Sequence, residues 1–111
     1  MEINEKTKTI AKLNDALRQT FTGGRVMLTE GVNNLGTKDK AELLREVCQF
    51  AAFTKDNNPH GEHDFGKIEI DGQSFFWKID YYNLAMNQHS VDPADPDATI
   101  RVLTIMRADE Y

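Results

Sequence analysis

The sequence has little of several features that define common protein classes. It contains a single cysteine, Cys48, among 111 residues, so no disulfide can form within the chain. No apolar run approaches the roughly 20 residues that a membrane-spanning helix requires. The first twenty residues mix charged and isolated apolar positions, unlike a secretory signal. We therefore expect a cytoplasmic protein without membrane contact, folded as a single domain over residues 1–111.

Positive charge is scarce in the second half of the chain. Residues 1–55 carry nine Lys and Arg against seven Asp and Glu, a net charge of +2, whereas residues 56–111 carry four against eleven, a net charge of −7. Binding to nucleic acid depends on cations that displace counterions from phosphates, so we expect no free nucleic acid as a partner. The acidic half suits a basic protein partner or a metal ion, and it also keeps a small domain soluble.

The first half of the chain begins with a helical pattern. Apolar residues at steps of three and four predict a helix at about Glu5–Thr20. The pair Gly23-Gly24 is expected to end it, because glycine readily adopts left-handed backbone angles. A short strand is predicted at Arg25–Thr29, followed by a loop over Gly31–Gly36.

A second helix is predicted after this loop. Thr37 is a suitable N-cap, and Asn57-Asn58-Pro59 stops the helical pattern because the residue before proline avoids helical angles. We expect Cys48 to be a buried thiol rather than a nucleophile, since it shares the apolar face of this helix. The residues predicted on that face are Leu44, Val47, Cys48 and Ala51.

A β-hairpin is the clearest local signal in the sequence. Asp71-Gly72 separates two runs of alternating apolar and polar residues, which is the strongest short-range pattern for a hairpin. A two-residue turn fixes the register, so the numbers of opposed residues sum to 143, as those of Asp71 and Gly72 do. Gly66 then faces Trp77 and leaves room for the indole. The residues predicted on the core face are Ile68, Ile70, Phe75, Trp77, Ile79 and Tyr81.

The order of predicted elements indicates the fold class. Asn83–Asp97 contains two Asp-Pro steps and is predicted to be a loop, and Thr99–Ala108 is predicted to be an interior strand. The order α-β-α-β-β-β indicates an α+β fold, with two helices on one face of a roughly four-stranded, mainly antiparallel sheet. The outer hairpin face carries Phe65, Phe76 and Tyr82, which would suit an interface between two copies of the chain.

The densest polar cluster lies just before the hairpin, in the segment PHGEHD. Continuing the hairpin register places His63 opposite Asp80. An imidazole beside a carboxylate can be a general base with the group that orients it, part of a binding site, or an anchor that pins a loop to a strand. The candidate binding residues are His60, Glu62, His63, Asp64, Asp80 and Tyr82.

Three of these residues are also candidate metal ligands: His60, His63 and Asp80. The spacing His-x-x-His differs from the helical His-Glu-x-x-His pattern of zinc proteases, and it follows a proline. Residues three apart on a strand point to opposite faces, so the two histidines converge only if the loop bends. The sequence therefore assigns no cofactor and no catalytic residue, and it favours a binding protein over an enzyme.

Several blocks of the sequence together resemble a known family. In order they are FTGGRVMLTEGV (21–32), PHGEHDFG (59–66), FFWKIDYY (75–82), DPADP (92–96) and RVLTIM (101–106). They resemble a small domain-of-unknown-function family of proteobacteria, often found on plasmids, phages and other mobile elements. The resemblance spans roughly residues 10–111 and implies no activity, because none is assigned to the family.

Two classes of function stay open at this point. The first is a non-catalytic binding protein that docks on another protein or on a second copy of itself, in a regulatory or anti-defence role that the resemblance to mobile-element families suggests. The second is a small metal-assisted hydrolase built on His60, His63 and Asp80, with Glu62 and Asp64 beside them. The hydrolase requires these side chains to converge within a few ångströms at a concave surface.

Overall fold

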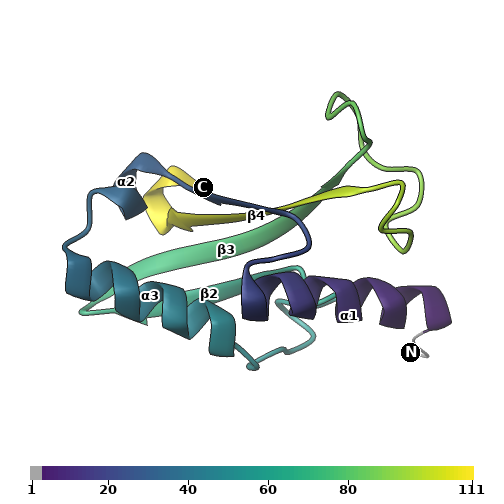
Figure 1. The fold of residues 1–111 in the computed structure, drawn as a ribbon. Helices are drawn as coiled ribbons and strands as arrows, with labels where there is room; N and C mark the ends of the chain where they lie inside the picture. Colours follow the sequence, from purple (N-terminus) through teal and green to yellow (C-terminus); the bar gives the residue numbers. More distant parts are fainter. Residues whose placement is uncertain (1–3) are drawn as a thin grey trace.

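The computed structural model describes residues 4–111. The elements in chain order are α1 (Glu5–Thr20), β1 (Arg25–Leu28), α2 (Glu30–Asn33), α3 (Thr37–Gln49), β2 (Phe65–Ile70), β3 (Gln73–Tyr82), β4 (Ile100–Arg107) and a 3-10 helix, η1 (Ala108–Glu110). The strands form one sheet in the order β1-β4-β3-β2, with α1 and α3 on the same side of it (Figure 1). The predicted α+β class is confirmed. None of the helices described here is long and apolar enough to cross a membrane.

The first helix has the predicted bounds but a different C-terminal cap. Asn4 caps the helix, since its side-chain oxygen accepts a hydrogen bond of 2.7 Å from the Thr7 amide. At the other end Phe21, with φ of 58°, is the left-handed residue, and its N–H donates to the Leu17 carbonyl. The prediction that Gly23-Gly24 ends the helix is therefore wrong by two residues. The left-handed cap thus comes before the two glycines, at a residue whose ring packs against the core.

The segment between β1 and α3 also differs from its prediction. The loop predicted over Gly31–Gly36 is wrong in its first half, because the short helix α2 covers Glu30–Asn33. The cap of α3 is Gly36 rather than Thr37. Val47 is fully buried as predicted, whereas Cys48 is partly exposed. Burial still raises the pKa of the Cys48 thiol, with nearby Arg18 opposing the shift, so the thiol is not activated as a nucleophile.

The hairpin has the predicted register. Gly66 opposes Trp77, and Ile68 opposes Phe75. Asp71 and Gly72 have φ of 49° and 78°, the pair of positive angles typical of a type I′ turn. All six residues predicted on the core face are buried. The final strand is interior as predicted, because β4 pairs antiparallel with β3 and parallel with β1.

The sheet has a second face that no helix covers, which we call the helix-free face. Successive side chains of a strand point to opposite faces, so Phe76, Lys78, Asp80 and Tyr82 of β3 lie on it together with Met27 of β1. The rings of Phe65, Phe76 and Tyr111 pack against one another there, with centroids 5.1–6.0 Å apart. Val102 and Met106 of β4 are buried on this face, whereas Met27 is 54% exposed.

The chain after β4 is fastened to the start of α2 by one carboxylate. The Glu110 side chain accepts hydrogen bonds from the Thr29 hydroxyl at 2.6 Å and from the Gly31 and Arg107 amides at 2.9 and 2.8 Å. Gly31 permits this approach, because a Cβ there would lie 2.6 Å from the carboxylate. These bonds lower the pKa of Glu110, with the Thr29 hydroxyl making the largest contribution.

We predict that the replacement Gly66→Ala destabilises the protein. A Cβ at this position would lie 2.7 Å from Cε2 of Trp77 and 2.8 Å from Cζ of Phe50, and forced overpacking costs about 1–3 kcal/mol. Urea denaturation should show the loss. The control is Gly36→Ala, where no atom lies within 4 Å of the new Cβ and the expected loss is below about 1 kcal/mol. Equal losses in the two variants would contradict the packing argument.

We also predict that acid releases the Glu110 contacts. The pKa of this carboxyl is lowered in the folded state, so the contacts contribute above the usual glutamate pKa of about 4.3 and are lost as the pH falls through the lowered value. An NMR titration should show the Gly31 and Arg107 amide resonances moving together in this acidic range. The same titration of Glu110→Ala should be flat, and an unchanged titration in that variant would refute the assignment.

Candidate functional site

The structure divides the six candidate residues between the two sides of the sheet. Glu62 and His63 contact side chains on the helix-covered side. The others line hollows on the helix-free side: His60, Asp64, Asp80 and Tyr82. The division has a simple cause, because the hairpin ladder ends at Asp64, whose carbonyl accepts from the Ile79 amide. The next residue toward the N-terminus is therefore free to turn to the opposite face.

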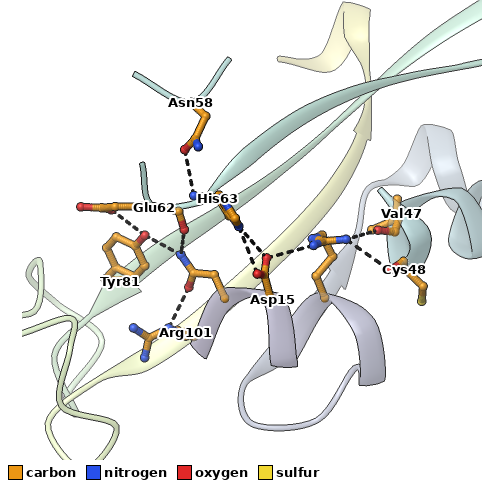
Figure 2. A network of polar contacts seen from close by, with 10 residues as sticks. Asp15, Val47, Cys48, Asn58, Glu62, His63, Tyr81 and Arg101 are labelled. Carbon is orange, nitrogen blue, oxygen red and sulfur yellow. Dashed lines mark hydrogen bonds and ion pairs between the residues drawn. The ribbon is translucent and has the colours of Figure 1, made fainter. Parts of the chain in front are cut away.

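His63 turns away from the residue it was predicted to face. Its φ is 55°, its N–H donates to the Asn58 side chain at 2.9 Å, and its Nδ1 lies 3.0 Å from both carboxylate oxygens of Asp15 in α1 (Figure 2). The ring also stacks on Phe53 with centroids 4.0 Å apart. The predicted contact between His63 and Asp80 is therefore wrong.

Asp15 joins His63 to a buried guanidinium. Arg18 is 1% exposed, and its Nη2 donates to Asp15 at 3.0 Å. Its Nη1 donates to the carbonyls of Val47 and Cys48 at 3.0 and 3.2 Å, in the last turn of α3 (Figure 2). Since a buried charge is costly unless it is paired and hydrogen-bonded, these contacts fix α1, α3 and the loop before β2 relative to one another.

Glu62 belongs to a second polar network beside the first. The fully buried Asn14 donates to the Glu62 carbonyl at 3.0 Å and to the Tyr81 hydroxyl at 2.7 Å, and it accepts from Nε of Arg101 at 2.8 Å. The Tyr81 hydroxyl donates to the Glu62 carboxylate at 2.7 Å. Burial, and then this hydrogen bond, raise the pKa of Tyr81, so the phenol stays protonated as a donor. Glu62 and His63 therefore act as anchors of the loop.

Sequence reasoning missed the partners of these anchors, although a signal for them exists. Asn14 and Arg18 lie four and eight residues after Ile10, on the helical face that also buries Leu17. Polar residues at the spacing of an apolar stripe are a mark of buried, paired polar groups. Asp15 and Arg101 carry no comparable pattern.

The remaining candidates line what we call the acidic groove, on the helix-free side. It consists of two adjoining hollows of about 340 and 260 Å³ that share Asp64, Ile79 and Asp80. Tyr81, Tyr82 and His89 complete the smaller hollow. The larger one is completed by residues of the loop and of the sheet, among them His60, Phe65, Lys78 and Tyr111. The groove thus combines carboxylates with aromatic walls.

The two carboxylates of the acidic groove differ in their partners. Asp80 lies 2.8 Å from the ammonium group of Lys78. Asp64 has no Lys, Arg or His nitrogen within 4.0 Å in the part of the chain that the structure describes. Burial raises the pKa of Asp64, and the nearby charges of Glu62 and Asp80 raise it further, while a backbone hydrogen bond and nearby His60 oppose the shift. A cation in the groove would relieve this repulsion.

The candidate metal ligands do not converge. Among residues 4–111 no group of three or more His, Cys, Asp or Glu side chains is arranged to hold a metal ion. His63 binds Asp15 on the helix-covered side, whereas Asp80 lies across the sheet beside Lys78. The metal-assisted hydrolase, which required His60, His63 and Asp80 to meet, lacks the geometry it needs.

A wider hollow of about 890 Å³ separates the start of α1 from the loop before β2. Its walls are mostly exposed loop residues, including Thr54, Lys55 and Pro59. Of the six candidates it touches only His60 and Glu62. Its charged groups are Lys55 and the single carboxylate of Glu62, whereas the acidic groove holds the carboxylate of Asp64, unpaired among residues 4–111, beside Asp80, so the acidic groove is the better candidate site.

Comparison with known proteins places most of the chain in one family. The model of a family described as "Protein of unknown function (DUF3768)" matches residues 28–110. The matched segment runs from the last residue of β1 through η1. It includes every residue of the acidic groove except Tyr111. No curated protein and no solved structure matches the chain.

We predict that His63→Ala loosens the loop before β2 without disturbing the hairpin. The replacement removes the contact with Asp15 and the stacking on Phe53, and losing such a partly buried charged hydrogen bond costs about 1–3 kcal/mol. Hydrogen exchange should accelerate in residues 53–63 and stay unchanged in β3. The matched control is His60→Ala, since His60 is exposed. Equal acceleration in both variants would show that His63 is not an anchor.

Proposed function

The chain belongs to the DUF3768 family of proteins of unknown function, and from its site we propose that it is a non-catalytic binding protein whose acidic groove receives a lysine or arginine side chain of a protein partner. The observation that carries this proposal is the half-buried carboxylate of Asp64, which has no ion-pair partner among the described residues. Such a group is compensated best by a cation brought from outside.

The surroundings of Asp64 support a peptide side chain as the source of that cation. Phe65 and Tyr111 border the larger hollow, and Tyr82 borders the smaller one. Aromatic rings attract cationic groups on their faces and cover the methylene groups of Lys and Arg. The Tyr111 side chain is 73% exposed, so it can pack against an incoming chain.

The charge of the whole second half of the chain supports the same partner chemistry. Residues 56–111 carry a net charge of −7, which attracts a basic protein surface over a distance before contact is made. A protein that acts by occupying a partner needs a surface of this kind and no catalytic group. A regulatory or anti-defence role fits that mode of action.

We predict that the charge of Asp64 contributes to binding and not to the stability of the fold. The raised pKa of Asp64 means that its ionised form is disfavoured in the folded protein, so Asp64→Asn should leave the free energy of unfolding unchanged or increase it. The same replacement removes the charge that the proposed ligand needs. Weaker binding with undiminished stability would separate a binding role from a structural one.

We predict that peptides selected from a random display library on the wild-type protein contain Lys or Arg next to an aromatic or aliphatic residue. Asp64→Lys should weaken their binding at least about tenfold, because it places two cations together in a partly buried site. Fluorescence anisotropy with the selected peptides measures the change.

The matched control for this experiment is Glu46→Lys, which makes the same change of charge on an exposed position of α3. It should weaken binding only slightly, through the net charge. If the selected peptides bind Asp64→Lys as tightly as the wild type, or if Glu46→Lys weakens them equally, the acidic groove is not the binding site.

A further inference from the structure

We propose a second docking surface, which adjoins the acidic groove at Tyr82: the outer edge of β1 accepts an extended, acidic and apolar segment of a protein partner as an additional strand. β1 is an edge of the sheet, and three features meet there. The edge has free backbone groups, Arg25 has no ion-pair partner among residues 4–111, and Met27 lies beside a hollow.

The backbone of β1 is paired on one side only. The Thr29 amide donates to the Ile105 carbonyl in β4 at 3.1 Å, and the backbone groups of alternate residues in a strand point to the same side. The N–H and C=O groups of Val26 and Leu28 therefore point away from the sheet. The Leu28 carbonyl is covered, since it accepts from the Asn33 side chain at 3.2 Å. Two N–H groups and one C=O group are left for an added strand.

This edge has few of the usual protections against strand addition. Natural edge strands are commonly guarded by their shortness, by proline, by charges, by bulges or by a covering element, and of these β1 has its length of four residues. β1 contains no proline or lysine, and its pairing with β4 runs through four consecutive residues without a bulge. Among the described residues, the Asn33 side chain shields part of the edge. An extended peptide can therefore bind by the backbone bonding that sheet-augmenting complexes use.

The side chains of β1 indicate the chemistry of the added segment. Met27 is 54% exposed and borders a hollow of about 450 Å³ on the helix-free face, together with Tyr82, Met86, Val102 and Thr104. Two methionines in the walls can adapt to different apolar side chains. An apolar residue of the added strand would pack against Met27 and enter this hollow.

Arg25 supplies the charge preference. It is exposed and also borders the hollow, and no carboxylate within the described part of the chain lies within 4.0 Å of its guanidinium. A guanidinium binds a carboxylate through two parallel hydrogen bonds. The segment that fits therefore carries Asp or Glu near an apolar residue, which is the opposite charge from the ligand of the acidic groove.

The test uses Asp64→Lys as the bait, so that the acidic groove is disabled and the two proposals can fail independently. A random peptide display library should yield extended sequences with Asp or Glu close to a large apolar residue. A second selection on a bait that also carries Arg25→Glu should change the enriched charge to Lys or Arg. Enrichment of the same peptides on both baits would overturn the role of Arg25.

A proline substitution tests the backbone contribution. The Val26 amide points out of the sheet, so Val26→Pro removes a donor that an added strand needs while the pairing with β4 is kept. We expect the selected peptides to bind this variant at least about tenfold more weakly, and to bind the control Val26→Ala within about threefold of the parent protein. Circular dichroism checks that both variants are folded.

Two results would overturn the proposal. The first is peptide binding that is equal in Val26→Pro and Val26→Ala, since strand addition at this edge requires the amide. The second is a concentration-dependent dimer of the free protein, seen by sedimentation, that Val26→Pro dissociates. That result would assign the edge to a second copy of the chain.

Discussion

The arrangement of the helices depends on one buried guanidinium. Arg18 packs against the rings of Phe53 and Trp77, with its central carbon 5.6 and 5.2 Å from their centroids, and it donates to carbonyls of the last turn of α3 and to Asp15. A cation taken from water needs all of these compensations at once. Both helices therefore contribute groups that compensate one side chain, and Asp15 connects it to His63 in the loop before β2.

Most of the fold could be predicted because its strongest signals are local. Asp71-Gly72 fixed the hairpin register, and with it the contact between Gly66 and Trp77 and the residues of the core face. The errors fall where tertiary contacts decide between local alternatives. Phe21 adopts a left-handed conformation while its ring packs on the core, although glycines that favour such angles follow at once. The short helix α2 is likewise held by the contacts of Glu110, from the far end of the sequence.

The candidate site could be predicted only in part. The alternation of β3 placed Asp80 and Tyr82 on the same face, where the structure shows both. Extending that alternation to His63 failed, because a pattern of period two holds only while the chain stays extended, and the ladder ends at Asp64. The partner of His63 is Asp15, 48 residues away. Neither spacing nor composition contains the information that pairs them.

The parallel pairing of β1 with β4 has a consequence for synthesis of the protein. The central strand β4 is the last in chain order, so it must enter between β1 and β3, elements already present on the nascent chain. Until residues 100–107 have been synthesised, the hairpin and β1 cannot join in one sheet. The apolar side chains that β4 packs beside stay partly exposed until then. Contacts between segments this distant in sequence form slowly, and exposed strands in the meantime favour aggregation. The sheet of this topology can therefore close only once β4 is available to pair with both neighbours.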